Sequence, residues 1–359
     1  MMSNIDKAEK MLKEKLLSRD YQIGDKLPTE RELLADLHVT RYALRQAMKR
    51  LRNEHYIVSR QGSGFYVGDP SQPSVKIRDQ KTIGVLTTHL ADYIFPKIIS
   101  GIDQVVSDQD YAVVLSNTHN EVARERQSLM NFLDSNISGL IVEPTKSAMK
   151  SPNLDIYQEL IRRRIPLVFM HAEYPELDQP VIKTADEDSE YELVNLLFKA
   201  HHRRILGVFQ IDDRQGVDRM HGFVRAYQEH PELATDSNLL MYQSEESFEK
   251  ICLKLKQFLA SNNRPTAIAA YNDQLAIKLM SWLQGQGYRI PDDISIVGFD
   301  NYSMSEYVTP KLTTASHPKR KMGMNAAQML LDQISHQSVA SVVFPPQIIE
   351  RESVRNLES

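Results

Sequence analysis

The larger part of the sequence alternates between two kinds of segment. Short runs rich in β-branched residues, such as TIGVLTT (82–88) and ISGLIVEP (137–144), are separated by longer segments whose apolar residues recur at helical spacing. The alternation resumes in the second half with RILGVFQ (204–210) and ISIVGFD (294–300). Strands that alternate with helices form parallel sheets covered by helices. The sequence therefore predicts an α/β domain of two doubly wound parallel-sheet lobes with a cleft between them.

Polar and aromatic residues stand directly after the predicted strands. Ligands of open parallel sheets bind beyond the carboxyl ends of the strands. The positions concerned are 88–95, Glu143, His171, 212–219, 271–273 and Asp300. Glu143 and Asp300 also raise the alternative of a glycosidase-like acid–base pair. No nucleophile, phosphate-loop or zinc-protease motif accompanies them, so binding of a polar ligand is the simpler hypothesis.

The first 68 residues follow a different pattern, which begins with two short helices. Pro28 ends the preceding segment, and Thr29 with Glu32 forms a capping box that predicts a helix start. After a turn at 38–39, Thr40 can cap a second helix. Helical spacing gives that second helix a core face of Leu44, Ala47, Met48 and Leu51 and an outer face of Arg41, Tyr42, Arg45, Gln46 and Lys49.

A short β-ribbon and a preceding helix complete this N-terminal pattern. Strands are predicted at 56–59 and 65–67, around a glycine-containing turn at 61–64. An amphipathic helix over 4–19 carries Ile5, Ala8, Leu12, Leu16 and Leu17 on one side. This α+β layout is that of a winged helix-turn-helix, which places its second helix in the major groove of DNA.

Charge is distributed unevenly along the chain. Residues 1–68 hold 13 Lys and Arg against 9 Asp and Glu, whereas the remainder holds 30 against 38. A basic head on an acidic body suits DNA binding, because attraction to phosphate supplies most non-specific affinity. The same excess also fits a solvated helical surface, so the motif rather than the charge carries the DNA-binding hypothesis.

The composition of the remaining sequence indicates a linker and a cellular location. Residues 69–81 contain two prolines, two serines and no apolar periodicity, which predicts a linker. No stretch resembles a membrane span or a secretion signal, and Cys252 is the only cysteine. We therefore expect a cytoplasmic protein with no membrane partner, disulfide, cofactor or metal site. His201 and His202 are adjacent and point apart on a helix, which argues against chelation.

The N-terminal pattern LPTERELLADLHVTRYALRQAMKRL, followed by RQGSGFYV, resembles the GntR family of winged-helix regulators over residues 5–68. His38 and His55 depart from this family because they replace its usual glycines. Histidine tolerates a left-handed backbone, so we expect the fold to persist with some loss of stability. The resemblance implies that the residues in contact with DNA are Glu30, Arg31, Thr40, Arg41, Arg45, Gln61 and Gly62.

The rest of the chain resembles another family, the lactose/galactose-repressor effector domain, which is related to periplasmic sugar-binding proteins. GVDRMHGF, YNDQLAIKLM and IPDDISIVGFDNYSMS carry this resemblance. It implies that Arg219, Asn272 and Asp300 contact a sugar. Strand-end topology adds Tyr93, Phe95, Glu143 and His171 as ligand-binding candidates, which suits a site with hydroxyl partners and aromatic rings. Phe95 as a core aromatic and His171 as a structural residue remain open alternatives.

Together the two resemblances imply a transcriptional repressor controlled by a sugar. We expect a homodimer on palindromic operator DNA and a pentose effector, for which L-arabinose is the first candidate. Another pentose, a free sugar-binding protein or a carbohydrate-processing enzyme are the alternatives. The expected divisions are a DNA-binding head over 1–68, a linker over 69–81, and an effector domain over 82–359 with lobes formed by 82–183 plus 314–338 and by 184–313 plus 339–357.

Overall fold

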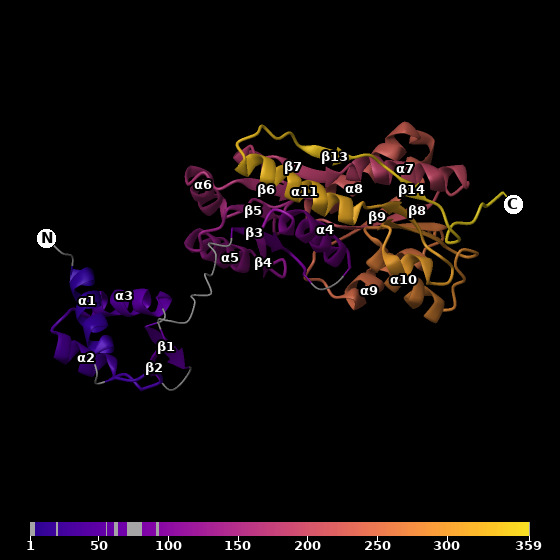
Figure 1. The fold of residues 1–359 in the computed structure, drawn as a ribbon. Coiled ribbons are helices and arrows are strands. Elements are labelled where there is room, and N and C mark those ends of the chain that lie inside the picture. The colour runs from indigo at the N-terminus through magenta and orange to yellow at the C-terminus, as the bar shows by residue number, and fades with distance from the viewer. Residues whose placement is uncertain are drawn as a thin grey trace. The chain divides into compact units, whose positions relative to one another are not determined.

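The computed structural model of the chain describes residues 4–18, 21–54, 56–60, 64–69, 81–90 and 93–358. The chain divides into two compact units, residues 1–80 and 81–359 (Figure 1). We call them the head and the effector unit. His55, Gln61 and Gly62 lie outside the described residues, as does most of the segment predicted as a linker.

The head consists of three helices and a two-stranded antiparallel ribbon. Its elements are α1 (Asn4–Leu17), α2 (Glu30–Leu37), α3 (Arg41–Asn53), β1 (Ile57–Arg60) and β2 (Gly64–Val67). The predicted core face of α3 is confirmed, because its four residues are at most 6% exposed. Leu17 is 62% exposed, so its predicted place on the apolar side of α1 is wrong. Five positions after Leu12, it has turned away from the stripe that Leu12 and Leu16 form.

The predicted turn between α2 and α3 has the expected caps. Thr29 accepts a hydrogen bond from the backbone N–H of Glu32, whose carboxylate accepts one from the Thr29 N–H at 2.7 Å. His38 ends α2 in the left-handed region, at φ 50° and ψ 41°, as predicted from the tolerance of histidine. The Thr40 hydroxyl accepts from the Ala43 N–H at 3.2 Å and begins α3. These contacts fix the angle at which α3 leaves the turn.

The effector unit contains two six-stranded sheets, and the first of them forms the N lobe. Its strand order is β13-β7-β6-β5-β3-β4, with every neighbouring pair parallel. The strands are β3 (Thr82–Thr87), β4 (Ala112–Asn117), β5 (Gly139–Val142), β6 (Leu167–Met170), β7 (Val181–Thr184) and β13 (Val342–Phe344). Helices α4 (Phe95–Ser107) and α11 (Lys319–Ile334) cover one face, and α5 (Val122–Asp134) and α6 (Leu154–Arg162) cover the other.

The second sheet forms the C lobe, with strand order β14-β12-β11-β10-β8-β9. Only the short β14 is antiparallel to its neighbour. The strands are β8 (Ile205–Gln210), β9 (Asn238–Tyr242), β10 (Ala267–Ala270), β11 (Ser295–Asp300), β12 (Thr313–Ser316) and β14 (Ile348–Ile349). Helices α7 (Asp186–Lys199) and α8 (Arg214–Glu229) cover one face, and α9 (Phe248–Leu259) and α10 (Asp273–Gly285) cover the other. Three short 3-10 helices lie at Pro175–Leu177, Pro231–Asp236 and Ser303–Glu306.

The chain crosses between the lobes three times, and two crossings differ from the predicted boundaries. The first falls at 184–186, as expected. Residues 314–316 were assigned to the N lobe, but they belong to β12 in the C-lobe sheet. Residues 342–344 were assigned to the C lobe, but as β13 they pair with β7 in the N lobe. Sequence periodicity could not allocate either strand to a sheet, because β12 is mostly polar and β13 is only three residues long.

Helices α4 and α11 lie side by side in the N lobe (Figure 1). A Cβ atom at Gly101 would stand 2.3 Å from the carbonyl oxygen of Arg320, and one at Gly323 would stand 2.0 Å from that of Ile98. Only glycine permits this backbone approach. The pair therefore fixes the N-terminal end of α11 firmly to the N lobe.

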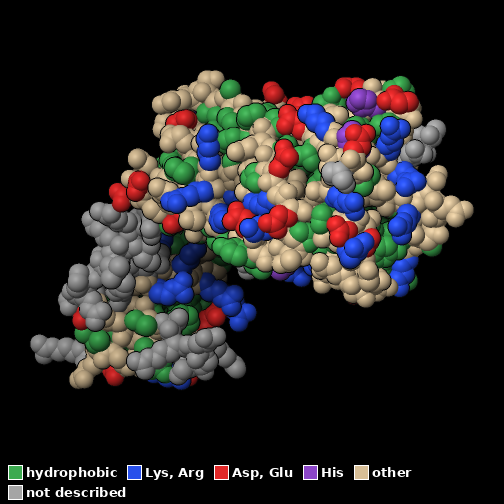
Figure 2. Space-filling view, turned by 90° about the vertical axis from the view of Figure 1, so that its right-hand side faces the viewer, with side chains coloured by type: hydrophobic (Ala, Val, Ile, Leu, Met, Phe, Trp, Pro, Cys, Tyr) green, Lys and Arg blue, Asp and Glu red, His purple; other side chains and the backbone are tan. Residues whose placement is uncertain are grey.

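Charged side chains of both signs are interleaved over the face of the effector unit that Figure 2 shows. Some exposed charges of the effector unit form ion pairs within one lobe, such as Arg126 with Asp155 at 2.9 Å. Exposed pairs of this kind contribute about 0–1 kcal/mol each. Charge reversal of such a pair is therefore expected to have little effect on how the two lobes meet.

Candidate functional site

The outer face of α3 presents two arginines that share one carboxylate. Arg41 Nε donates to Glu30 Oε1 at 3.1 Å, and Arg45 Nε donates to the same oxygen at 2.9 Å. The arginine side chains are 72% and 63% exposed. Their hydrogen bonds and charges, first that of Arg45, lower the pKa of Glu30. Glu30 is thus an ionised partner that holds the two guanidinium groups close together. Both guanidinium groups remain exposed and can donate to phosphate or to the edge of a guanine base.

The structure describes only some of the other residues predicted to contact DNA. Thr40 acts as the N-cap of α3, a role that also brings its hydroxyl to a helix N-terminus suited to phosphate. Arg31 belongs to α2, but its side chain is not described. Gln61 and Gly62 lie outside the described residues. DNA contact by these residues stays a prediction.

The effector unit contains a cavity of about 300 Å³ between the carboxyl ends of the two parallel sheets. Its wall includes all seven residues predicted for ligand binding, namely Tyr93, Phe95, Glu143, His171, Arg219, Asn272 and Asp300. They come from both lobes, so a molecule in the cavity can contact both at once. This placement follows from the rule that parallel strands gather their carboxyl ends at one edge.

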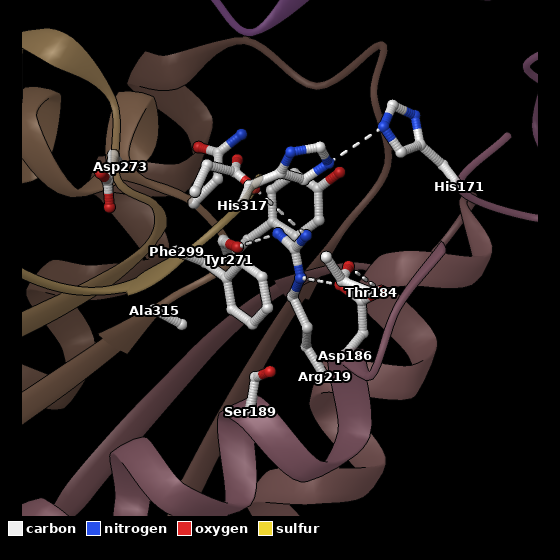
Figure 3. Close-up of polar contacts among 12 residues, drawn as sticks. His171, Thr184, Asp186, Ser189, Arg219, Tyr271, Asp273, Phe299, Ala315 and His317 are labelled. Atoms are coloured by element: carbon white, nitrogen blue, oxygen red, sulfur yellow. Dashed lines mark hydrogen bonds and ion pairs between the residues drawn. The ribbon is translucent and has the colours of Figure 1, made fainter. Parts of the chain in front are cut away.

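Arg219 is the central charge of the cavity and is 1% exposed (Figure 3). Its Nε donates to Asp186 at 2.8 Å, and its Nη1 donates to the carbonyl oxygen of Tyr271 at 2.7 Å. The guanidinium also stacks 3.6 Å from the centre of the Phe299 ring. Burial disfavours its charge, but Asp186 and Asp300 outweigh burial and raise the pKa of Arg219. The guanidinium is therefore charged and held in one orientation.

One donor and one acceptor beside this guanidinium have no hydrogen-bond partner among the described residues. They are Arg219 Nη2 and Asp300 Oδ1, which lie 3.5 Å apart. Buried polar atoms without partners are costly. A ligand hydroxyl can accept from the first and donate to the second, so the pair matches the two faces of one hydroxyl group.

The N-lobe wall is built on the carboxylate of Glu143. Its Oε2 accepts from the backbone N–H and the hydroxyl of Thr88 at 2.8 and 2.6 Å, and its Oε1 lies 2.8 Å from His171 Nδ1. Burial raises its pKa, but the hydrogen bonds from His171 and Thr88 outweigh burial, so the pKa of Glu143 is lowered. His171 Nε2 in turn lies 3.0 Å from His317 Nε2 (Figure 3). His171 is thus hydrogen-bonded, as its structural alternative predicted, and it also lines the cavity, so its contact with a ligand stays a prediction.

Tyr93, Phe95 and Asn272 each have a second role besides lining the cavity. The Tyr93 hydroxyl donates to the Asp300 carboxylate and, at 3.1 Å, to the carbonyl oxygen of Phe299. Phe95 is 5% exposed and packs in the N-lobe core, as its alternative assignment predicted. Asn272 caps α10 with its side-chain oxygen, which accepts from the Leu275 N–H at 2.9 Å. Its side-chain NH₂ group is therefore the part that remains to contact a ligand.

Sequence reasoning did not single out Asp186, Asp213, Tyr271 or His317. Asp213 accepts from the Tyr271 hydroxyl at 2.5 Å and from the Gly216 N–H at 2.6 Å, and burial raises its pKa to about 6. Asp213 and Tyr271 both lie in the strand-end windows that the sequence marked, so their positions were predictable. Asp186 follows β7, a strand that was not predicted, and no sequence signal pointed to it.

The two lobes are also joined at the rim of the cavity. Lys146 of the N lobe forms an ion pair with Glu245 of the C lobe. Asn120 Nδ2 donates to Ser244 Oγ at 3.1 Å, and the Arg214 N–H donates to Ser147 Oγ at 2.9 Å. We call these three contacts the rim contacts. They join the two lobes outside the buried network around Arg219.

The described residues also bear on two other classes of site, membrane spans and metal centres. Among the described residues, no helix combines the length and apolarity that a membrane crossing requires. Within the same part of the chain, no cluster of three or more His, Cys, Asp or Glu side chains is arranged to hold a metal ion.

Comparison with known proteins matches both units. Residues 4–67 match the family of bacterial regulatory proteins termed gntR, and residues 194–354 match the periplasmic binding protein-like domain. The chain is 39% identical over 347 residues to the arabinose metabolism transcriptional repressor of Geobacillus stearothermophilus, covering 95% of each chain. It is 32% identical to the repressor of the same name from Halalkalibacterium halodurans, covering 98% of this chain and 96% of that one.

A solved structure with a bound sugar has the same fold as the effector unit. It is a LacI family transcriptional regulator from Enterococcus faecium with bound ribose. The similarity has a TM-score of 0.67 at 26% sequence identity and covers 77% of this chain and 100% of that chain. The predicted combination of a GntR-type head with a periplasmic-binding-protein-like body is therefore confirmed.

Proposed function

The chain belongs to the family of arabinose metabolism transcriptional repressors, and from that premise we propose that L-arabinose binds its cavity and releases it from operator DNA. Its relatives are transcriptional regulators rather than enzymes. The observation that carries the proposal is a donor and an acceptor in the cavity wall, Arg219 Nη2 and Asp300 Oδ1, which form an ion pair at 3.5 Å but have no hydrogen-bond partner among the described residues. A neutral sugar hydroxyl satisfies both atoms without adding charge.

The size and lining of the cavity support a monosaccharide of this kind. About 300 Å³ suits a small ligand, and Phe95, Tyr93 and Tyr271 supply apolar ring surface among polar groups. The Glu143 carboxylate, whose pKa is lowered by its hydrogen bonds, would repel an acidic sugar. The names of the two repressor relatives favour L-arabinose, and the ribose-bound regulator favours a pentose more generally.

Release from DNA would follow from the contacts that the sugar makes with both lobes. A ligand shifts an equilibrium only through its differential affinity for two states, which is about 1–3 kcal/mol in typical allosteric coupling. We propose that the protein acts as a homodimer on a palindromic operator, with one head on each half-site. Loss of simultaneous engagement by the two heads would amplify a modest bias into release.

The test is an operator-binding titration of the full chain with L-arabinose, D-ribose, D-xylose and no sugar. We expect release by L-arabinose at lower concentration than by any other pentose, and recovery of the sugar unchanged. Release by another pentose alone would replace the effector and keep the mechanism. Release by none of these sugars would overturn the induction model, and turnover of the sugar would favour the enzyme alternative.

A further inference from the structure

Lys319 stands at the first position of α11, is 7% exposed, and directs its ammonium at backbone rather than at a carboxylate. Its Nζ donates to the carbonyl oxygen of Asp300, to that of Asn301 at 2.9 Å, and to that of His317 at 3.3 Å. A lysine ammonium has three protons, and here each has a carbonyl acceptor. The side chain therefore acts as a clamp on the backbone that follows β11.

The clamped backbone is strained. Asp300 has φ 101° and Asn301 has φ 47°, two successive non-glycine residues in the left-handed half of the map. Residues in this region are disfavoured and persist only where the surroundings hold them. Backbone strain of this kind is found at binding sites, where a side chain must be held in one orientation. Here that side chain is the Asp300 carboxylate, which lines the cavity and whose Oδ1 has no hydrogen-bond partner among the described residues.

The base of the clamp is rigid and belongs to the other lobe. Helix α11 packs on α4 through Gly101 and Gly323, where no larger residue fits. Lys319 thus connects a fixed helix of the N lobe to the end of a C-lobe strand. Burial lowers the pKa of Lys319 and nearby Lys97 lowers it further, whereas Asp300 and Asp273 oppose both by favouring the ammonium.

We infer that Lys319 is a positioning residue for the effector: it holds the Asp300 carboxylate in the cavity through the backbone without touching the ligand. This inference rests on the proposed function, since it concerns binding at the same cavity. Without the clamp, the 300–301 backbone can relax toward an extended conformation. The carboxylate would then lose its fixed place beside Arg219.

The test compares Lys319→Met with Lys321→Met, a matched control on the same helix whose side chain is exposed. Calorimetric titration of L-arabinose should show about tenfold or greater loss of affinity for Lys319→Met, the effect of hydrogen bonds from a charged group, and less than twofold for Lys321→Met. In an Asp300→Asn background, Lys319→Met should cost less than about twofold, because the group that it positions is already altered.

A merely structural role for Lys319 predicts a different result. The loss of affinity would then be equal in the wild-type and Asp300→Asn backgrounds, and this outcome would overturn the inference. Where Lys319→Met folds poorly, Lys319→Arg keeps the charge but not the convergent donors, and the same non-additivity is expected. If wild-type protein binds L-arabinose but the effects add, the inference fails while the proposed function stands.

A second measurement needs no sugar and separates the inference from the proposed function. Hydrogen exchange of sugar-free protein should show faster exchange over residues 299–304 in Lys319→Met than in Lys321→Met. Unchanged exchange there would overturn the clamp even if no pentose binds. Operator binding without sugar should be equal in both variants, because neither residue belongs to the head.

Discussion

At the scale of single residues, the buried charges of the effector unit are arranged around Arg219. Two of its nitrogens are committed to fixed partners, Asp186 and the Tyr271 carbonyl, while Nη2 remains without a hydrogen bond. Commitment of the first two prevents the guanidinium from rotating, so the third points in a constant direction. A buried ion pair of this type fixes the orientation of the guanidinium, but it adds little to the net stability of the fold because desolvation offsets the attraction.

Arg219→Lys should therefore abolish effector binding and destabilise the fold. An ammonium cannot reach Asp186 and the Tyr271 carbonyl together, and one buried carboxylate would lose its partner, which costs about 3–5 kcal/mol. Arg225→Lys is the matched control on α8, because Arg225 forms its ion pairs at the surface. Urea unfolding and calorimetric titration would test both variants, and equal stability losses would contradict the argument.

Glu190 provides a second prediction at this scale. Neither of its carboxylate oxygens has a hydrogen-bond partner among the described residues, and burial raises its pKa to about 8 despite the opposing charge of Arg219. The folded state therefore binds a proton that the unfolded state, with a pKa near 4.5, releases. Stability from this group is complete below pH 4.5 and declines as pH rises toward 8.

Glu190→Gln should raise the free energy of unfolding at pH 8 by on the order of 1–3 kcal/mol and leave it nearly unchanged at pH 4.5. The exposed neighbour Glu192→Gln is the control on α7. Urea unfolding of both variants at several pH values measures the effect. A gain that does not depend on pH would mean that Glu190 is hydrated rather than protonated.

At the scale of elements, the recognition helix α3 is the clearest case of prediction from sequence. Its capping threonine, its core face and its exposed arginines were all readable, because helical spacing and cap chemistry are local. Glu30 was predicted as a DNA contact, and the structure adds that it binds both arginines. That pairing joins two helices across a turn, which no local pattern encodes.

Arg45→Ala should lower operator affinity by about 1–3 kcal/mol, the range of a bidentate base or phosphate contact. The fold and L-arabinose binding should persist, since Arg45 is exposed and outside the core. Lys10→Ala, an exposed residue of α1, is the control with the same change of charge. Gel-shift titrations at two salt concentrations would measure both, and an unchanged operator affinity for Arg45→Ala would remove it from the interface.

Elements without a strong local signature were missed. Strand β7 is four residues long, and β9 lies beyond a turn-rich stretch, so neither stood out as a β-branched run. The cavity residues that depended on unpredicted elements, such as Asp186, were missed with them. Residues at the carboxyl ends of strong strands, such as Glu143 after β5 and Asp300 at the end of β11, were placed correctly in the cavity wall, because the topology of parallel sheets determines their position.

At the scale of the whole effector unit, the rim contacts join the lobes outside the buried network. Lys146→Glu opposes Glu245 with a like charge and should weaken L-arabinose affinity up to about fivefold, the range of an exposed ion pair. Lys146→Glu combined with Glu245→Lys should restore it. Reversal of Arg126 and Asp155, which lie within one lobe, should change nothing. Equal affinities for all variants would show that the rim does not bias closure.

The three crossings of the chain between the lobes have a consequence for synthesis. The N lobe lacks α11, with its clamp residue Lys319, until residue 334 has been made, and it lacks its outer strand β13 until residue 344 has been made. The head is complete in sequence after residue 68, long before that point. During translation the ability to hold DNA is therefore encoded first and the ability to respond last. A product truncated before β13 would therefore retain the complete DNA-binding head and lack a complete effector cavity.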